Sequence, residues 1–272
     1  MLVCALGDLL LDLIVRLEEP LGRGDDARAK TRVGAGGQAA NVAAWAAFLG
    51  ARARLIAKRA DDACGRLISA ELAERGVEVV GPVVGGRSGV VVSLVDAEGE
   101  RTMATDRGVS GDLRPDEIDL AWLSGVDVLH LSGYALLRSP SDAAAAKAAE
   151  VARAQGARIS VDLSSARGIE TRGAKRARRQ LGALKPDTVL ASERELEALG
   201  ALPPAGEIVI KRGPRGVTRL EDGRREDHPA LPGPMVDPTG AGDAFAAGFL
   251  VGGIELGLGA AARCLATMGA MP

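Results

Sequence analysis

Asp237-Pro238-Thr239-Gly240-Ala241-Gly242-Asp243 is a glycine-rich stretch that leads directly into the apolar segment 244–250. Its proline and two glycines disfavour helix before about Ala241, whereas the residues that follow place Phe245 and Phe249 on one helical face. The unpaired N–H groups at the start of such a helix, together with its dipole, make an anion-binding site. The stretch therefore predicts a turn, an anion site and a buried helix.

An acid, Asp243, stands inside this predicted anion site, where its charge repels an anionic ligand. A carboxylate beside a phosphate is useful if it accepts a proton from a hydroxyl group, because phosphoryl transfer otherwise needs mainly positioning and charge neutralisation. The alternative is an acid that only favours the helix dipole. The seven residues closely resemble the second signature of the ribokinase-like (PfkB-type) sugar kinases, and this length favours the catalytic interpretation.

The resemblance implies an ATP-dependent kinase that phosphorylates a hydroxyl of a sugar or sugar acid. Asp243 would be the catalytic base, and the amides of Gly240, Ala241 and Gly242 would hold the transferring phosphoryl group. Thr239 would lie beside ATP. Magnesium would accompany ATP, and K⁺ or a similar monovalent ion near the anion site is common in the family.

The family's first signature is represented by Gly36, Gly37 and Asn41. Paired glycines let the backbone approach a sugar, and an asparagine offers a donor and an acceptor to hydroxyl groups. By resemblance these residues and Asp12 bind the substrate. The alternatives are an ordinary helix-start turn and, for Asp12, a strand-end acid that faces water. Ala60 replaces the glycine that usually precedes the family's acid pair, and we expect a local change of backbone there.

Two further segments resemble the nucleotide side of the family's site. The family's Asn-x-x-Glu, whose glutamate organises Mg²⁺ and its water shell, is matched by Ser192 and Glu195; a first-turn acid favouring the helix dipole is the alternative for Glu195. Its Thr-x-Gly-x-x-Gly loop is matched with Lys211 in place of threonine, followed by Gly213 and Gly216. A cation there, with Arg212 as a second candidate, is suited to ATP phosphates.

The composition fits an enzyme of the cytoplasm. The 272 residues are 47% hydrophobic with a formal net charge of −2, which argues against nucleic acid as the main partner. No apolar run approaches the roughly 18 residues of a membrane span. Three scattered cysteines predict free thiols rather than disulfides. The two histidines are too few for a histidine metal site or triad, and His130 is interpreted as a core residue.

Strands and helices alternate from Val77 onward, which predicts an α/β fold with a doubly wound, mostly parallel sheet and helices on both faces. Asp162 ends one predicted strand, where ligand-facing residues collect. Residues 172–179 are predicted as a basic helical run, and 252–257 as a break before a last helix at 258–268. By resemblance, the segments at about 16–35 and 83–108, with a hairpin 90–95/101–105, form a small β lid on a single domain spanning 1–272.

The substrate is less constrained than the reaction. Arg101 and Arg107 in the predicted lid would suit a carboxylate or phosphate on the substrate, and the alternative is that both are solvated. Aromatic residues are 2% of the chain and are absent from both lid segments, which counts against a nucleoside, the substrate of other kinases in the family. Ribose, fructose and sugar acids stay open.

Two other functions are alternatives to the kinase. A dinucleotide-dependent oxidoreductase is disfavoured because Gly7-Asp8 after the first strand begins no Gly-x-Gly-x-x-Gly. A catalytically weak relative that senses a sugar or nucleotide is suggested by Ser192 and Lys211, although the retained Asp243 argues against it. By resemblance, pairing of lid strands between subunits predicts a homodimer.

Overall fold

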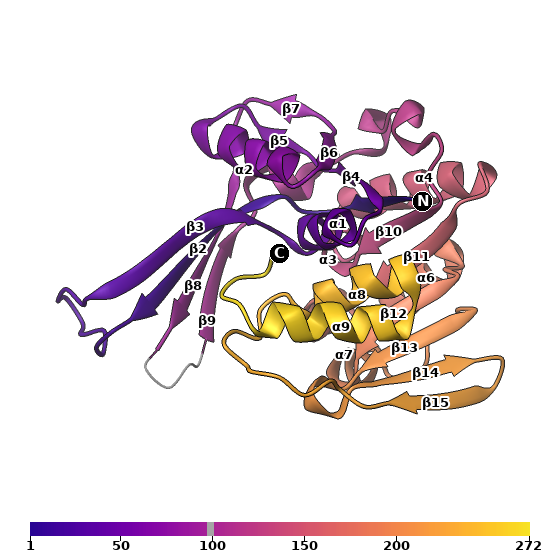
Figure 1. The fold of residues 1–272 in the computed structure, drawn as a ribbon. Coiled ribbons are helices and arrows are strands. Elements are labelled where there is room, and N and C mark those ends of the chain that lie inside the picture. The colour runs from indigo at the N-terminus through magenta and orange to yellow at the C-terminus, as the bar shows by residue number, and fades with distance from the viewer. Residues whose placement is uncertain (97–100) are drawn as a thin grey trace.

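A nine-stranded sheet forms the centre of the protein in a computed structural model that describes residues 1–96 and 101–272 (Figure 1). Neighbouring strands from β13 to β6 are parallel, and β14 and β15 add an antiparallel ribbon at one edge. The strands, in spatial order, are β15 (Arg224–His228), β14 (Val217–Glu221), β13 (Glu207–Lys211), β12 (Thr188–Ser192), β11 (Arg158–Asp162), β10 (Val128–Ser132), β1 (Leu2–Leu6), β4 (Arg52–Ile56) and β6 (Val77–Val80).

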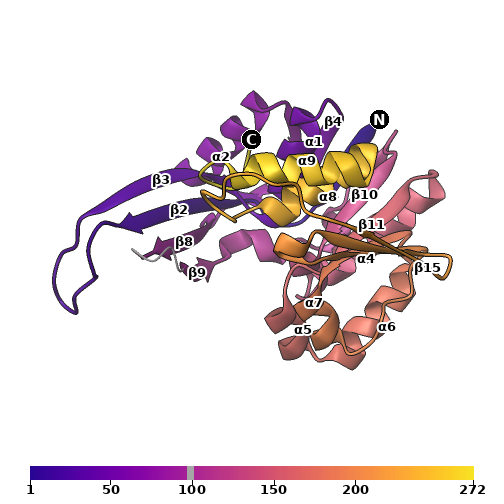
Figure 2. The ribbon, with the colours of Figure 1, turned by 60° about the horizontal axis from the view of Figure 1, so that its bottom comes forward.

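Helices cover both faces of this sheet, which confirms the predicted α/β class (Figure 2). Alternate residues of one strand point to opposite faces. In β1, Val3 and Ala5 therefore join the core with α1, α2, α8 and α9, whereas Cys4 and Leu6 join the core with α4, α6 and α7. The helices are α1 (Gln38–Phe48), α2 (Ala63–Glu74), α3 (Gly133–Leu136), α4 (Ser141–Ala154), α5 (Ala166–Arg172), α6 (Ala174–Leu184), α7 (Glu193–Leu199), α8 (Ala241–Gly252) and α9 (Ile254–Leu265).

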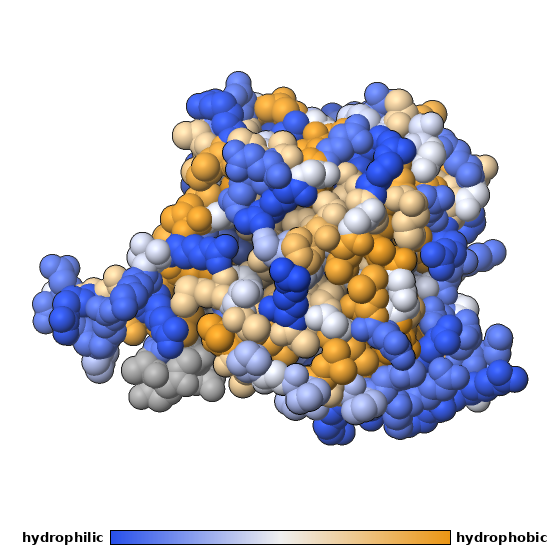
Figure 3. Space-filling view, viewed as in Figure 1, coloured by the Kyte–Doolittle hydropathy of each residue, from blue (hydrophilic) through white to orange (hydrophobic). Residues whose placement is uncertain are grey.

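A separate sheet of four strands, here called the small sheet, projects from one side of the main body (Figure 1). Its order is β3 (Ala29–Gly36), β2 (Leu10–Leu17), β8 (Gly89–Val95) and β9 (Arg101–Asp106). Hydrophilic residues gather over the free end of the β2–β3 ribbon, as they do over β14–β15 (Figure 3). The free end of the small sheet is therefore a solvent-facing surface.

The small sheet differs in extent from the predicted lid segments. Strand β2 begins at Leu10, ahead of residue 16, because it continues the apolar run that follows β1. The short strand β7 (Val83–Val84) pairs with β5 (Arg59–Ala60) instead of joining the small sheet. Strands β8 and β9 pair in antiparallel register as the predicted hairpin requires, and its connecting residues 97–100 lie outside the described residues. Ala60 is buried in β5, opposite Val84.

The predicted break at 252–257 and the start of the last helix at 258 are wrong. Helix α8 starts at Ala241, as predicted, and runs to Gly252; only Gly253, with φ 84°, separates it from α9. An ideal Cβ on Gly248 would lie 2.7 Å from the Cα of Gly257. Gly248 of α8 and Gly257 of α9 are therefore needed for close packing of the two helices, and this contact outweighs their low intrinsic helix propensity.

The predicted basic run 172–179 is also divided in the structure. Helix α5 ends at Arg172, and α6 starts at Ala174 after Gly173, which adopts φ 89°. Because glycine accepts a positive φ without steric strain, the chain turns there instead of continuing one helix. The arginines before and after the turn consequently belong to two helices.

Candidate active site

The carboxyl ends of four neighbouring strands bring polar side chains to one edge of the main sheet. Ser132 ends β10 opposite Asp162 at the end of β11, and Ser192 ends β12 opposite Lys211 at the end of β13. In open α/β sheets, ligands bind outside this edge. The glycine-rich stretch before α8 lies against the same edge, because an ideal Cβ on Gly242 would be 3.6 Å from Lys211 Nζ.

The turn before α8 is held by Asp237, which is buried. Its Oδ1 accepts hydrogen bonds from the Thr239 backbone N–H at 2.9 Å and from the Thr239 hydroxyl at 2.6 Å. Gly240 follows with φ 76°, and an ideal Cβ there would be 2.6 Å from Ala270. Glycine is thus required at this position by both conformation and space. The Ala241 N–H donates a hydrogen bond of 3.4 Å to the Pro238 carbonyl group, and the Gly242 N–H has no acceptor one turn earlier within the helix. The N-terminal end of a helix is a position that favours anions.

Asp243 lies in the first turn of α8, where Asn41 of α1 holds its carboxylate. Asn41 Nδ2 donates a hydrogen bond of 2.7 Å to Asp243 Oδ2. Burial raises the pKa of the Asp243 carboxyl to about 7; the Asn41 hydrogen bond opposes this rise, and the nearby Asp162 carboxylate adds to it. A carboxyl group with a pKa close to neutral is matched to accept a proton from a hydroxyl near physiological pH.

Asn41 is predicted to bind substrate, and in the structure its side chain also contacts Asp243. Its amide nitrogen is engaged by Asp243, whereas its buried Oδ1 has no hydrogen-bond partner among the described residues. The adjoining Gly37 adopts φ 104°, with an ideal Cβ 2.4 Å from the Asp8 carbonyl oxygen. The Asn41 amide oxygen is thus the group left to accept a hydrogen bond from a substrate hydroxyl, whereas glycine at position 37 is required by the close approach of the Asp8 carbonyl group.

Gly36 and Asp12 are placed together by the pairing of β2 with β3. An ideal Cβ on Gly36 would lie 2.1 Å from Asp12 Cγ, so only glycine leaves space for this carboxylate. Asp12 lines a cavity of about 20 Å³ with Arg32, Glu71 and the segment 269–271. Asp243 is not among the residues that line this cavity. Asp12 therefore lies in a cavity formed by the small sheet, α2 and residues 269–271.

Lys211 sits between two acids at the sheet edge. Its ammonium forms an ion pair with Asp162, whose side chain is 1% exposed. Burial by itself lowers the pKa of Lys211, but the Asp162 and Glu195 carboxylates outweigh burial and raise it. Lys211 is therefore a fixed cation next to the first turn of α8. Sequence analysis placed Lys211 near ATP phosphates, but it did not identify Asp162 as its partner.

Glu195 and Ser192 form a capping box at the start of α7. Glu195 Oε2 accepts the Ser192 backbone N–H at 2.7 Å, and Ser192 Oγ accepts the Glu195 N–H at 3.3 Å. Burial raises the pKa of Glu195, and the Asp162 carboxylate adds to this effect. Glu195 forms no ion pair within the described part of the chain. The replacement of asparagine by serine thus preserves the helix cap, and a buried acid stays available beside Lys211.

The Gly-x-x-Gly turn connects β13 to β14 and stays a candidate nucleotide loop. Gly213 and Gly216 adopt φ 57° and 81°, and an ideal Cβ on Gly216 would be 2.0 Å from the His228 carbonyl oxygen. Arg212, the second predicted phosphate contact, donates to the carbonyl groups of Arg215 and Val217. Arg212 is therefore occupied in shaping the turn.

A second cluster, which sequence analysis did not assemble, joins Asp8, Arg107 and Tyr134. Asp8 follows β1 at the carboxyl edge of the sheet and forms an ion pair with Arg107, which follows β9 of the small sheet. The Arg107 guanidinium lies 4.5 Å from the centroid of the Tyr134 ring. The sequence predicted Arg107 as a contact to the substrate, but the signal for its partner was only the acid of Gly7-Asp8 directly after the first strand. Arg101 lies in β9, but its side chain lies outside the described residues.

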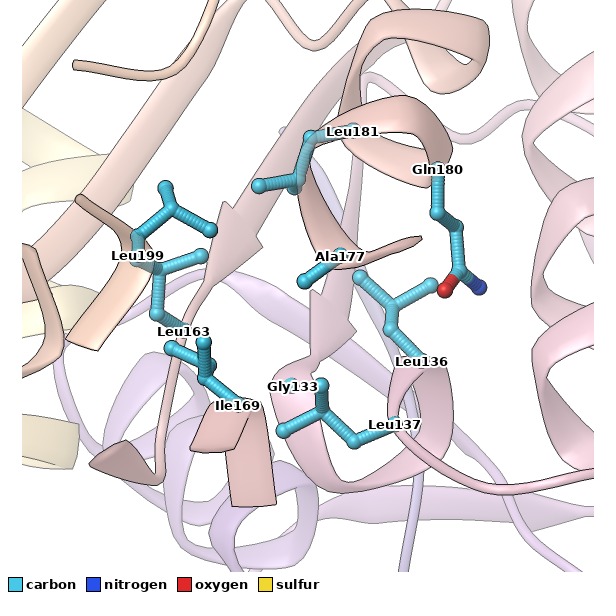
Figure 4. Close-up of a pocket in the computed structure, with 9 residues that line it drawn as sticks. All are labelled: Gly133, Leu136, Leu137, Leu163, Ile169, Ala177, Gln180, Leu181 and Leu199. Atoms are coloured by element: carbon cyan, nitrogen blue, oxygen red, sulfur yellow. The ribbon is translucent and has the colours of Figure 1, made fainter. Parts of the chain in front are cut away.

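His130 is a core residue beside the candidate site, whereas the small cavity in Figure 4 is separate from it. His130 is fully buried between Gln38 and Ser160, each 3.2 Å away, and burial lowers its pKa to about 4. The cavity in Figure 4 measures about 20 Å³ and has an almost entirely apolar lining, so it is a packing space between α3, α6 and α7.

No cluster of three or more potential metal-binding His, Cys, Asp or Glu side chains occurs in the described ranges. No helix there is long and apolar enough to span a bilayer.

Comparison with known proteins identifies the family. A family described as pfkB family carbohydrate kinase matches residues 1–264. The chain is 32% identical over 259 residues to an ATP-dependent ribose-1-phosphate kinase of Halopiger xanaduensis, covering 91% of this chain and 83% of that relative. It is 31% identical over 234 residues to fructokinase-1 of Zea mays, covering 79% of this chain and 72% of the relative.

A solved structure agrees with these relatives. An uncharacterized sugar kinase of Pyrococcus horikoshii in complex with ATP matches with a TM-score of 0.84 and 25% identity, over 98% of this chain and 93% of that chain. The resemblance that rests on the two glycine-rich motifs is thereby confirmed, and the chain belongs to the pfkB family of carbohydrate kinases.

Proposed function

We propose that this protein is an ATP-dependent kinase that phosphorylates a hydroxyl group of a sugar or sugar acid. The observation that carries the proposal is Asp243, which stands in the first turn of an anion-binding helix with its carboxylate held by Asn41. Membership of the carbohydrate kinase family and the names of the relatives, which include a ribose-1-phosphate kinase and a fructokinase, support the same reaction.

In the proposed reaction, the acceptor hydroxyl lies between Asp243 and the γ-phosphate of ATP. Asp243 takes the hydroxyl proton, the hydroxyl oxygen bonds to the γ-phosphorus, and the bond from that phosphorus to the β–γ bridging oxygen breaks to release ADP. The amides of Gly240, Ala241 and Gly242 and the Lys211 ammonium neutralise the charge of the transferring group. The phosphorylated sugar leaves, and Asp243 returns its proton to water.

Magnesium fits the nucleotide side of this site. Mg²⁺ is bound in such sites by one or two carboxylates, several waters and the substrate's phosphates, so a dedicated cluster of three acids is not required. Glu195 is a buried carboxylate next to Lys211 whose charge is not fully compensated, and it is suited to hold the water shell of the ion. When bound, Mg²⁺ supplies charge neutralisation to the ATP phosphates. We propose Gly213, Gly216 and Thr239 as further ATP contacts and a K⁺ requirement like that of the family.

We propose that the small sheet closes over the substrate as a lid on a single domain spanning 1–272. Arg107 follows strand β9, and Gly36 ends strand β3. Both positions support a role for the sheet in the substrate site, together with Asp12, Gly37 and Asn41. Closure would exclude water, which competes with the sugar hydroxyl for the phosphoryl group.

The edges of the small sheet support a homodimer. Val33 in the edge strand β3 is 51% exposed, and Met103 in the opposite edge strand β9 is 61% exposed. Edge strands offer unpaired backbone groups to a second chain. We expect light scattering to give twice the mass of one 27.9 kDa chain, and a monomer at assay concentration would contradict this expectation.

We place the protein in the cytoplasm, with small molecules rather than nucleic acids as its ligands.

Two alternative functions are distinguished from the sugar kinase by the test below. A nucleoside kinase of the same family would need a surface for the base, and Tyr134 beside Arg107 is the aromatic ring that the structure offers near the site. A relative that senses a sugar or nucleotide without turnover is suggested by Ser192 and Lys211. The capping box and the Asp162 ion pair show that both substitutions are structurally accommodated, which favours the enzyme.

The test is ADP release from ATP and Mg²⁺ over a panel of sugars, sugar acids, sugar phosphates and nucleosides. We expect turnover with one sugar or sugar-acid group, lost in Asp243→Asn. Turnover with nucleosides alone would favour the first alternative. Thermal stabilisation by ATP and a sugar, with ADP release no faster than in the variant for every acceptor, would overturn the proposal in favour of a sensor.

The activity should depend on pH through Asp243. Because its pKa is raised to about 7, the base is mostly protonated below that pH and cannot accept the hydroxyl proton. The value of kcat/KM should therefore rise with pH through about 7 and level off near pH 8, with about one tenth of the plateau at pH 6 and about half at pH 7. Initial rates in a buffer series of constant ionic strength measure this profile. A flat profile from about pH 5 to 7 would contradict the assigned base.

A further inference from the structure

A large cavity with an arginine-rich lining lies next to the proposed active site. It measures about 610 Å³, within the usual size of small-molecule sites. It opens where β10 and β11 end, between the loops that follow these strands and the helices α5 and α6. We call this cavity the arginine basin; it is lined by Arg107, Tyr134, Leu137, Arg138, Ser139, Ser165, Arg167, Gly168, Thr171, Arg172 and Arg176.

The basin concentrates positive charge that the protein itself does not neutralise. None of the described lining residues is acidic, although the chain as a whole has a net charge of −2. Arg107 pairs with Asp8, and Arg172 pairs with Asp142. The guanidinium groups of Arg138, Arg167 and Arg176 form no ion pair or hydrogen bond with other described residues.

The arginines also repel one another. Burial lowers the pKa of Arg107, and the neighbouring charge of Arg138 lowers it further. An ideal Cβ on Gly111 would lie 3.9 Å from both side chains, so the two arginines flank one glycine. Like charges held together beside a cavity are stabilised when an anion binds between them. The basin is thus built for an anionic group.

The basin neighbours the proposed site of phosphoryl transfer through the turn after β11 and through Tyr134. Asp162 Oδ2 accepts a hydrogen bond from the Lys211 ammonium, and Asp162 Oδ1 accepts one from the Ser164 backbone N–H. Ser164 adopts φ 59°, a strained conformation for serine, and this turn leads directly to Ser165 and Arg167 of the basin. On the other side, the Tyr134 hydroxyl experiences the charges of Arg107, Asp243 and Asp162. Tyr134 therefore lies both on the lining of the basin and within electrostatic range of Asp243.

We infer that the acceptor substrate carries an anionic group, a phosphate or a carboxylate, which the arginine basin binds while the hydroxyl to be phosphorylated lies at Asp243. This inference rests on the proposed function. The ATP phosphates have their own partners at Gly240, Ala241, Gly242 and Lys211, on the opposite side of Asp162. Guanidinium groups recognise phosphates and carboxylates through paired hydrogen bonds, which suits either group.

The experiment compares matched substrates that differ only in the anionic group. Ribose is assayed beside ribose 1-phosphate, ribose 5-phosphate and ribonate, and fructose and glucose beside their phosphates and acids. Each series is run with the wild type, with the double variant Arg138→Gln/Arg167→Gln, and with Arg179→Gln. Arg179 is an exposed arginine of α6 outside the basin, so it controls for a general loss of positive charge.

We expect an anionic acceptor to be preferred, and the double variant to lower its kcat/KM by roughly 10- to 100-fold, since each lost charge-assisted hydrogen bond has a large effect. The KM for ATP and the turnover of neutral sugars should stay unchanged, and Arg179→Gln should behave as the wild type. The phosphate and acid series then identify which anion is used. Equal use of neutral and anionic acceptors, or a raised KM for ATP instead, would overturn the inference and leave the kinase assignment intact.

Calorimetry without ATP separates the two proposals if no acceptor is phosphorylated. The ribose phosphates and inorganic phosphate serve as probes. Binding to the wild type and Arg179→Gln that is lost in the double variant would support the basin although the kinase assignment fails. Absence of binding to all three proteins would overturn the basin as well.

Discussion

Asp243→Asn should lower kcat by about 10²- to 10⁴-fold while the fold is retained, since a positioned general base contributes an effect of this size. Asparagine has the same shape, and its amide oxygen can accept the hydrogen bond that Asn41 now donates to Asp243 Oδ2. It cannot take a proton from the acceptor hydroxyl. Single-turnover measurements of ADP formation separate this chemical step from substrate binding, which we expect to change little.

The same variant should be at least as stable as the wild type at neutral pH. The folded-state pKa of Asp243 is raised to about 7, above the ordinary value near 3.8, so the folded protein binds a proton more tightly than the unfolded chain. Stability contributed by this group is therefore lost as pH rises from about 4 to 7, and asparagine removes that loss. Thermal unfolding at pH 8 measures it. Activity close to that of the wild type would exclude Asp243 as the base, and strong destabilisation would mean that the lost activity reflects misfolding.

Lys211→Met should both destabilise the protein and weaken ATP binding. It leaves Asp162, whose side chain is 1% exposed, as a buried carboxylate without its ion-pair partner. Removal of one partner of a buried pair costs about 3–5 kcal/mol, which lowers Tm on the order of 10 °C for a chain of this size. The loss of a fixed cation beside Gly242 should also raise the KM for ATP roughly tenfold.

The two effects of Lys211 are separable. In the double variant Asp162→Asn/Lys211→Met, both charges of the ion pair are removed together, so much of the stability should return while the KM for ATP stays high. Lys175→Met, at an exposed position of α6, is the control for loss of a lysine and should change stability by less than about 0.5 kcal/mol. Recovery of ATP binding together with stability would show that Lys211 acts only through Asp162.

The sequence was sufficient for features that are local in the chain. The turn at Gly240 and the helix that begins at Ala241 follow from residues next to one another, because a positive φ and helix initiation are local properties. Alternating strands and helices predicted the mostly parallel sheet. The position of Asp162 at the end of β11 required only the end of an apolar run. Asp243 was likewise identified from one continuous motif.

Where local preference and packing disagreed, packing prevailed. Residues 252–257 were predicted to interrupt the helices because of their glycines, but α9 begins at Ile254. Glycine lowers helix propensity by about 1 kcal/mol, whereas the close contact between α8 and α9 at Gly248 and Gly257 is possible only without side chains. This contact is invisible in either segment alone.

The sequence by itself thus determined the family, the fold class and Asp243 as the proposed catalytic base, whereas the tertiary structure decided what surrounds that carboxylate. Asn41 meets Asp243, Lys211 meets Asp162 and Arg107 meets Asp8 across distant parts of the chain. These contacts depend on the order of strands in the sheet and on the course of the loops after them, which hydrophobic patterning does not encode. The arginine basin has the same origin, because its charges come from separate segments that are neighbours only after the sheet has formed.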